Sequence, residues 1–176
     1  PTMRRFLLWL VMVAATLALI LGGSAAFFYT QAGPADLPQQ PVAFGGAELE
    51  PNGWDWSVPV LGGRLTKQVQ SPTNLSVQHL GTFSEDIPAL ALPDWVTRAK
   101  VTVTAPSGVQ WSGSADEFAA YTYDQNGSYR LTLTAWHIAE ETTEPEGWYA
   151  YCADFTLQQQ PKVALSADRA VQGSVV

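Results

Sequence analysis

Few residues of this chain are of the types that carry out catalysis, and they are scattered. The 176 residues include two histidines, His79 and His137, and a single cysteine, Cys152. A catalytic zinc ion needs about three protein ligands, usually with a close histidine pair, and neither H-x-H nor H-E-x-x-H occurs. We therefore expect both histidines to be ordinary surface or rim residues, and we predict no metal site.

Nucleophilic catalysis has equally little support in the sequence. No G-x-S-x-G segment is present to hold a serine at a strand-to-helix turn. Cys152 lies in an aromatic run from Trp148 to Phe155, where a half-buried structural thiol is expected rather than a reactive one. Adjacent carboxylates such as Glu85 and Asp86 would face opposite ways on a strand, so their spacing does not make an acid/base pair. We predict no catalytic residue and no cofactor site.

Two features suit binding better than catalysis. Residues 140–146 contain four glutamates, which are calcium-type ligands, but the segment lacks the Asp/Asn-Gly alternation of calcium loops, so we expect a solvated loop. The chain also has seven tryptophans, whose rings can stack on sugars. We name Trp54 and Trp56 as candidate ligand-stacking residues, while noting that core packing is the commoner use of tryptophans in strands.

The elements that position these residues begin with an apolar segment. Residues 6–29 contain no charge, and as a helix they would span about 36 Å against a hydrocarbon core of about 30 Å. Arg4 and Arg5 precede the segment and the next basic residue is Arg64, so the positive-inside rule places the N-terminus in the cytoplasm. We predict a retained signal-anchor with the bilayer as its partner. The alternative is a cleavable signal peptide, because Ser24-Ala25-Ala26 has cleavage-like spacing.

The remainder of the chain is acidic. Beyond residue 30 there are 16 acidic and seven basic residues, a net charge of −9. This charge repels nucleic acid, which we exclude as a partner, and it argues against binding to anionic lipid. A single cysteine permits no internal disulfide, which favours a bacterial source over a secreted eukaryotic one.

The pattern after the apolar segment predicts a tether followed by strands. Residues 31–53 hold four prolines and four glycines without periodicity, which is typical of a semi-extended linker. From Trp54 onward, runs of period-two alternation are separated by turn signals and no amphipathic helix intervenes, which predicts an antiparallel β-sandwich. Pro59 would place its strand at a sheet edge. The clearest strand patterns are residues 54–60, 99–105, 129–135 and 148–157.

One hairpin carries a resemblance to a known family. Residues 118–135, with a turn at Asp124-Gln125-Asn126-Gly127 and a strand that begins at Ser128-Tyr129, resemble the penultimate hairpin of bacterial immunoglobulin-like domains. The resemblance implies an all-β, immunoglobulin-like antiparallel sandwich in which Tyr129 docks like a tyrosine corner. The two cysteines and the tryptophan of antibody domains are missing, which excludes the antibody-type subclass.

The organisation of the chain carries a second resemblance. A short basic tip, one anchor, a tether and the segment 54–63 (WDWSVPVLGG) are similar to the N-terminal regions of membrane-anchored lysostaphin-type zinc endopeptidases of Gram-positive bacteria. In that family β-modules precede a peptidoglycan-cleaving domain. The family's H-x-x-x-D and H-x-H motifs are absent here, so no catalytic residue is carried over and any zinc would belong to a downstream domain.

These resemblances imply a non-catalytic role as membrane anchor and spacer, with peptidoglycan or another cell-envelope component as partner. The alternative is a surface adhesion or scaffold protein of tandem immunoglobulin-like modules that binds a glycan or a protein. Residues 161–176 start a new strand pattern, so we expect a second β-module there. The predicted plan is a cytoplasmic tip (1–5), a transmembrane helix (6–29), a tether (30–53), a β-sandwich (54–160) and a truncated second module (161–176).

Overall fold

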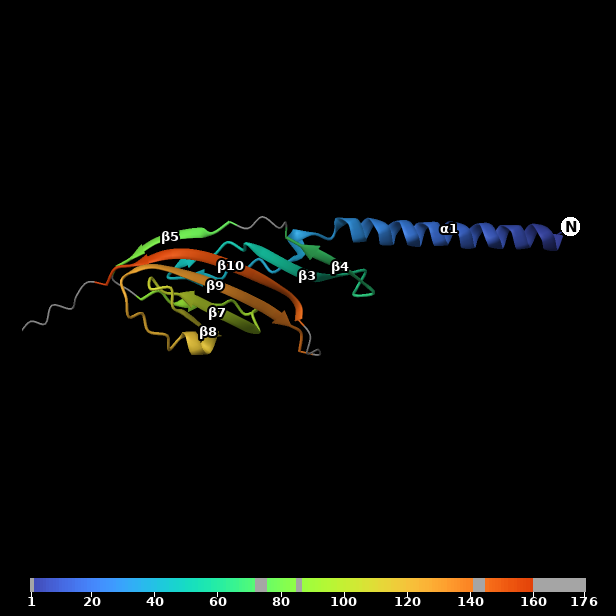
Figure 1. The fold of residues 1–176 in the computed structure, drawn as a ribbon. Coiled ribbons are helices and arrows are strands. Elements are labelled where there is room, and N and C mark those ends of the chain that lie inside the picture. The colour runs from blue at the N-terminus through green and yellow to red at the C-terminus, as the bar shows by residue number, and fades with distance from the viewer. Residues whose placement is uncertain (1, 72–75, 85–86, 141–144, 160–176) are drawn as a thin grey trace, which may run out of the picture.

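The computed structural model describes residues 2–71, 76–84, 87–140 and 145–159. Its first element, α1 (Thr2–Gln31), is one uninterrupted helix of 30 residues that projects away from a β-domain (Figure 1). Residues Met3–Gln31 are long and apolar enough to cross a membrane, and their most apolar 18-residue window has a mean hydropathy of 2.4 and is unburied. The prediction of a membrane-length apolar helix is confirmed.

Seven strands form the large sheet of the β-domain. All neighbouring strands pair antiparallel except β5, which pairs parallel with β10. The predicted runs 54–60, 99–105, 129–135 and 148–157 all fall within or beside strands of this sheet. Its order is β4 (Leu65–Gln70), β3 (Gly53–Val60), β10 (Pro145–Leu157), β9 (Gly127–Ile138), β7 (Arg98–Thr104) and β8 (Gln110–Ser114), with β5 (Gln78–Phe83) also on β10.

Two strands, β3 and β5, share one edge of β10. Residues 147–150 of β10 pair with β3, and residues 153–157 pair with β5. The second half of β3 therefore extends past β10 and has only β4 as a neighbour, where Pro59 lies opposite Thr66. A proline has no N–H to donate, so it is tolerated where a strand has a single partner. Pro59 is thus at a local edge, as its sequence position predicted.

The alternation in the sequence produces one apolar face on this sheet. Successive side chains of a strand point to opposite faces, so every second residue of β7, β9 and β10 is buried. On β9 the buried set is Tyr129, Leu131, Leu133 and Ala135, all at most 1% exposed. We call this side of the sheet the inner face, and the opposite side the outer face.

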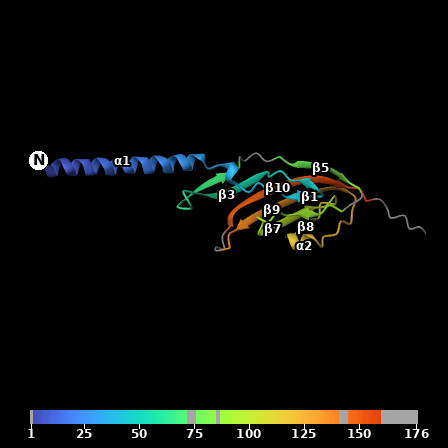
Figure 2. The ribbon, with the colours of Figure 1, turned by 180° about the vertical axis from the view of Figure 1, so that it is seen from behind.

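A smaller layer covers the inner face, and most of it is built from the segment expected to be a tether. The short strands β1 (Ala43–Phe44), β2 (Ala47–Glu48) and β6 (Leu90–Ala91) form a second sheet (Figure 2), preceded by the 3₁₀ turn η1 (Pro34–Asp36). Phe44 is fully buried, with its ring centroid 5.0 Å from that of Phe155 in β10.

The prediction of a free tether over residues 30–53 is therefore wrong. Leu37, Val42, Phe44 and Leu49 are buried in the core, and the Tyr149 hydroxyl donates a hydrogen bond to the Pro38 carbonyl. Prolines and glycines shape this segment into turns, while its few large apolar side chains are spaced so that each reaches the inner face. Composition averages over the segment, whereas burial depends on which individual side chains meet a partner.

The expected hairpin over residues 118–135 also differs in its first half. Residues Ala115–Phe118 form a single helical turn, α2, in which the Ser114 hydroxyl accepts from the Glu117 N–H and the Glu117 carboxylate accepts from the Ser114 N–H. Residues 119–126 are irregular, and β9 pairs with β7 and β10 instead. The predicted docking of Tyr129 is present, because its hydroxyl donates to the Gln125 carbonyl at 2.7 Å.

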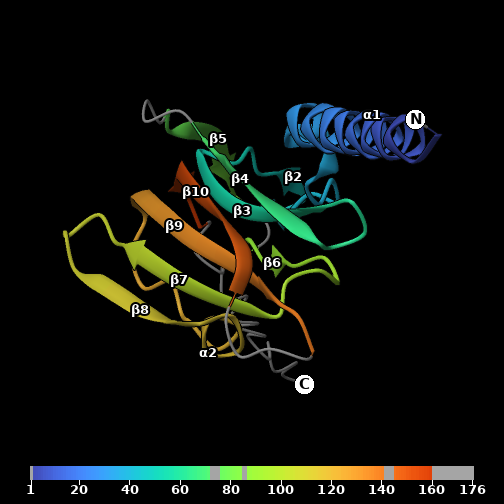
Figure 3. The same ribbon diagram turned by 90° about the vertical axis from the view of Figure 1, so that its right-hand side faces the viewer.

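The helix joins the β-domain beside the β4 edge of the large sheet (Figure 3). The Lys67 ammonium of β4 donates hydrogen bonds to the carbonyls of Thr30 and Ala32 and lies 5.5 Å from the centroid of the Tyr29 ring. The last carbonyls of a helix have no intrahelical partner and carry negative partial charge, so a lysine there is stabilising. Ala32 is itself buried, so the β-domain begins directly at the end of the helix.

The observed architecture is a long apolar helix followed by antiparallel β-sheets in two layers, as the predicted all-β class requires. The chain therefore has no separate linker between the helix and the β-domain. The second module expected at residues 161–176 lies outside the described residues.

Candidate functional site

The outer face of the large sheet is uncovered and polar. The pairings of β8, β7, β9 and β10 align its side chains in rows that run across the four strands. No described element packs over these rows, so they are open to a ligand (Figure 3). From one end to the other, the residues that β7, β9 and β10 contribute to these rows are Thr104-Arg130-Asp154, Thr102-Thr132-Cys152, Lys100-Thr134-Ala150 and Arg98-Trp136-Trp148.

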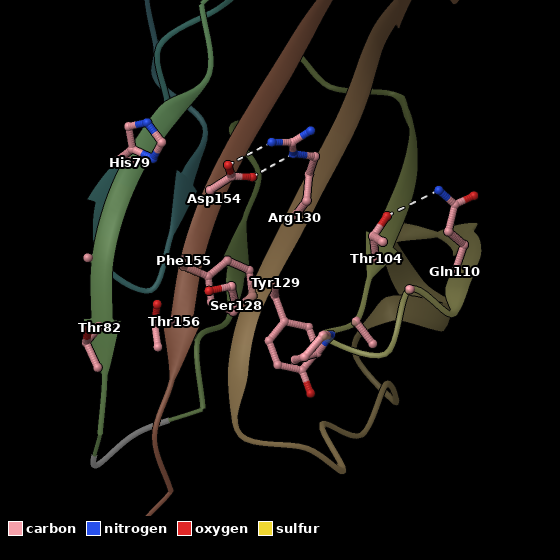
Figure 4. Close-up of a pocket in the computed structure, with 14 residues that line it drawn as sticks. His79, Thr82, Thr104, Gln110, Ser128, Tyr129, Arg130, Asp154, Phe155 and Thr156 are labelled. Carbon is pink, nitrogen blue, oxygen red and sulfur yellow. Dashed lines mark hydrogen bonds and ion pairs between the residues drawn. The ribbon is translucent and has the colours of Figure 1, made fainter.

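A hollow of about 730 Å³ lies at the first end of this face (Figure 4). Arg130 of β9 and Asp154 of β10 meet across it with two hydrogen bonds, Nε to Oδ1 at 2.7 Å and Nη2 to Oδ2 at 2.8 Å. His79 of β5 lies on the other side of Asp154, directly opposite it in the parallel pairing. The remaining labelled polar side chains are Thr82, Thr104, Gln110, Ser128 and Thr156.

The ion pair sets the charge state of this hollow. The hydrogen bonds from Arg130 lower the pKa of the Asp154 carboxyl below its ordinary value, and the charges of Arg130 and His79 act in the same direction. Burial acts in the opposite direction and has a larger effect than either charge, but the hydrogen bonds outweigh it. The same contact raises the pKa of Arg130. Asp154 is therefore an ionised hydrogen-bond acceptor at neutral pH rather than a proton donor.

Hydroxyl groups occupy the middle of the outer face. The hydroxyls of Thr102 and Ser112 are 3.0 Å apart across β7 and β8, and the Gln110 side-chain amide donates to the Thr104 hydroxyl at 3.3 Å. Cys152 is half-buried opposite Thr132, in the position expected of a structural thiol. These groups both donate and accept hydrogen bonds, so they can bind a polar ligand of either kind.

Two indole rings lie at the other end of the face, nearer to α1. Trp136 of β9 and Trp148 of β10 are directly opposite each other, and both are partly exposed. The Arg98 guanidinium lies 4.7 Å from the centroid of the Trp136 ring. A second hollow of about 530 Å³ is bounded by Trp136, Arg98, Lys100 and three small residues of β8, Ser112, Gly113 and Ser114.

This combination suits recognition of an extended polar polymer. Indole faces stack on sugar rings or other flat groups, hydroxyls and amides bind polar substituents, and Arg98 and Lys100 attract negative charge. The described residues contain no cluster of metal-ligating side chains. The face thus has the components of a binding surface, and its described residues do not include a set of catalytic side chains in mutual contact.

Trp54 and Trp56, the two residues predicted to stack on a ligand, lie on the inner face instead. Trp56 is 5% exposed, and its ring packs against those of Trp95, Tyr149 and His137. Trp54 is partly buried, with its ring centroid 6.3 Å from that of Tyr149. A stacking role does not fit Trp56, because the core encloses its ring; for Trp54, whose side chain is partly exposed, stacking stays a prediction.

The two histidines have separate positions. His137 is half-buried at the end of β9, where its Nδ1 lies 2.7 Å from the Trp95 carbonyl oxygen and its Nε2 lies 3.6 Å from the Glu146 carboxylate. His79 is exposed at the far end of the sheet. They therefore do not form a pair, in agreement with the rim positions that we expected.

Sequence reasoning did not single out Trp136 and Trp148, although a signal was present. Both residues occupy polar positions of their alternating runs, beside Thr134 in β9 and Ala150 in β10. A tryptophan at such a position must point away from the core if the alternation holds. That the two rings lie opposite each other depends on the pairing register, which local sequence does not specify.

No family model, curated protein or solved structure matches this chain at a significant level. The functional argument therefore rests on the geometry of the outer face, the apolar helix and the charge distribution.

Proposed function

We propose that this chain is a membrane-anchored β-sandwich module on the extracytoplasmic side of a membrane, where it acts as anchor and spacer. The observation that carries the proposal is α1, an apolar helix of membrane length that is unburied and joined directly to a folded domain. Within it, the hydroxyls of Thr16, Ser24 and Thr30 donate to carbonyls of their own helix. A helix in lipid must satisfy its polar groups internally, and α1 does so.

The orientation follows from the flanking charges. Arg4 and Arg5 precede the apolar segment, and the β-domain beyond it is strongly acidic. Basic residues are retained on the cytoplasmic side, so the β-domain lies outside the cell. The acidic surface keeps the domain soluble there.

The family resemblance gives this anchor a context. We propose that the module is the non-catalytic N-terminal part of a peptidoglycan metallopeptidase, and that it holds a zinc-dependent catalytic domain near the cell wall. The hydrogen bond of Tyr129 supports an immunoglobulin-like type, whereas the division into seven strands and three short strands is less even than in an immunoglobulin sandwich. The coding sequence that follows Val176 tests this part, since it must contain H-x-x-x-D and H-x-H motifs.

Cysteine accessibility tests the location. We expect Val109→Cys, in a Cys152→Ser background, to react with a membrane-impermeant maleimide in intact cells, because Val109 is 66% exposed at the β7–β8 turn. Met3→Cys serves as the matched control and should react only after the membrane is permeabilised. Labelling of the Met3 site, and not of the Val109 site, in intact cells would reverse the topology and remove the envelope role.

A second function, glycan binding by a surface adhesion or scaffold module, is favoured by the partly exposed pair Trp136 and Trp148. We expect the chain to co-sediment with purified peptidoglycan. The double substitution Trp136→Ala and Trp148→Ala should weaken this binding at least about tenfold, because stacking of a flat ligand group on an aromatic ring contributes about 1–3 kcal/mol. The matched control is Val109→Ser, an exposed apolar residue off the outer face. Unchanged sedimentation of the double variant would leave only the role of anchor and spacer.

A further inference from the structure

The turn between β3 and β4 has an unusual backbone for its residue types. We call residues 61–65 (Leu61-Gly62-Gly63-Arg64-Leu65) the β3–β4 tip. Leu61 has φ 52°, the one positive φ at a non-glycine residue in the described part of the chain, and Gly62 and Gly63 continue it with φ 65° and 86°. A left-handed conformation costs a leucine about 1–2 kcal/mol, and turns normally use Gly, Asn or Asp there.

The tip is also apolar where a turn in water would be polar. Leu65 is 46% exposed, and Leu61 is partly exposed. Neither leucine belongs to the buried core of the β-domain. Two leucines at an exposed turn, one of them in a strained conformation, are unfavourable in water and favourable where an apolar phase is within reach.

The membrane is within reach because of where the tip lies. Figures 1 and 2 show the β3–β4 turn as the part of the β-domain that extends furthest along α1 toward its N-terminus. Lys67 of β4 contacts the carbonyls of Thr30 and Ala32, which fixes β4 beside the end of the helix. Leu65 is two residues closer to the tip, about 7 Å further at the usual rise of a strand.

That distance sets the depth of the tip relative to α1. About 7 Å along a helix corresponds to four or five residues, because the rise is about 1.5 Å per residue. Leu65 is therefore level with the neighbourhood of Phe27 and Phe28, whose exposed rings form the aromatic end of the apolar segment. Aromatic residues of this kind mark the interface between acyl chains and headgroups.

The charge of the hairpin fits the same location. The sequence from Trp56 to Ser84 contains no Asp or Glu, in a chain that carries 16 acidic residues. Arg64 is exposed at the tip, and Lys67 lies two residues after Leu65. The tip is thus a basic part of an acidic domain, and lipid phosphates are the anions at this level. The repulsion from anionic lipid expected of the whole domain does not apply to this part.

We propose that the β3–β4 tip inserts into the headgroup region of the same bilayer that α1 spans, as a second membrane contact. Leu61 and Leu65 contact the outer ends of the acyl chains, and Arg64 pairs with a lipid phosphate. The inference rests on the proposed membrane anchoring by α1. Two leucines would bind a bilayer weakly on their own, but α1 makes the contact intramolecular, so a modest affinity is sufficient.

The contact would fix the β-domain relative to the membrane. A domain attached only through α1 could tilt about the helix end, whereas attachment at α1 and at the tip defines a plane. The β4 edge of the sheet then lies nearest α1, and β8 lies at the edge farthest from it, as Figure 3 shows. The outer face is held upright beside the membrane, with its rows accessible to a polymer that runs along the cell wall.

Site-specific fluorescence on the full chain tests the insertion. In a Cys152→Ser background, we would attach the environment-sensitive dye NBD to Leu65→Cys, Val109→Cys or Leu17→Cys. Each labelled chain is reconstituted into phosphatidylcholine–phosphatidylglycerol vesicles with or without doxyl-labelled lipid. Val109 is the matched control, since it is an exposed apolar residue in a turn at the opposite end of the sheet, and Leu17 reports on α1 itself.

We expect doxyl lipid to quench the dye at Leu65 at least about twofold more than the dye at Val109, because only the former contacts lipid. Arg64→Glu should reduce the quenching at Leu65, since it replaces attraction to phosphate by repulsion. Quenching at Leu17 with equal, low quenching at Leu65 and Val109 would overturn the inference and leave the anchor intact. Absence of quenching at Leu17 would remove the anchor and the second contact together.

Discussion

The absence of a side chain at Gly147 leaves room for the Trp56 ring in its aromatic cluster. Gly147 lies opposite Trp56 in the β3–β10 pairing, and a Cβ at this position would overlap the indole ring. We expect Gly147→Ala to lower the free energy of unfolding by about 1–3 kcal/mol, because the ring has no free volume into which it can move. Urea denaturation of the full chain in detergent micelles measures this difference.

Gly33→Ala is the matched control for that substitution. Gly33 has φ −164°, an extended conformation open to any residue, and the nearest atom to an added Cβ would be 3.9 Å away. Its effect should stay within about 0.5 kcal/mol, as for other sites without close neighbours. Equal losses at the two glycines would contradict the packing described for Trp56.

The Arg130–Asp154 pair makes a small, pH-dependent contribution to stability. The pKa of Asp154 is lower in the folded chain than its ordinary value, so the stabilisation is present above the unfolded-state pKa and is lost as pH falls through the folded-state pKa. Both side chains are partly exposed, at 54% and 27%, so screening by solvent keeps the contribution small.

We therefore expect Asp154→Asn to destabilise the chain slightly at pH 7 and to have almost no effect once the pH is below the lowered folded-state pKa of Asp154, where the wild-type carboxylate is also protonated. Urea denaturation of both proteins across this range, at low and high salt, provides the comparison. A difference that grew toward acid pH would mean that Arg130 does not stabilise the ionised carboxylate.

At the scale of elements, the junction between α1 and β4 depends on one side chain. Lys67 donates to two carbonyls at the helix end and lies over the Tyr29 ring. We expect Lys67→Ala to speed hydrogen exchange of the backbone amides of residues 32–37 about fivefold in nanodiscs, since a charged hydrogen bond at a helix C-terminus contributes about 1 kcal/mol.

Lys100→Ala provides the comparison for this element, because Lys100 is an exposed lysine on the outer face and away from the helix. Its exchange pattern near α1 should match that of the unmodified chain. If both variants gave the same protection at residues 32–37, the hydrogen bonds of Lys67 would not stabilise the junction between α1 and β4.

At the scale of the whole molecule, the second layer is required for the β-domain to fold. A chain that begins at residue 54 lacks β1 and β2 and the buried side chains of Leu37, Val42, Phe44 and Leu49. We expect it to aggregate or remain unfolded, because the inner face of the large sheet would be exposed to water. A chain that begins at residue 31 keeps both layers and should be a folded monomer.

Circular dichroism and size-exclusion chromatography distinguish these two chains. A cooperative thermal transition is expected only for the longer one. If the chain from residue 54 also folded cooperatively, residues 31–53 would behave as the tether that their composition predicts.

The strands of the large sheet were largely predictable because their signal is local. Alternation of period two identified the runs that became β3, β7, β9 and β10. The apolar helix was equally predictable, since length and absence of charge decide it. The small layer, α2 and the parallel strand β5 were not predicted, because short elements have no periodicity of their own and form where distant residues offer partners.

The sequence by itself determined which side chains of each strand share a face, because the pleat of a strand alternates independently of its neighbours. It also determined that residues 6–29 of α1 carry no charge. Only the tertiary structure decided which strands are adjacent, and hence that Trp56 is enclosed while Trp136 and Trp148 meet on the outer face. The physical reason is that register and pairing depend on contacts between residues far apart in the chain, which no local pattern specifies.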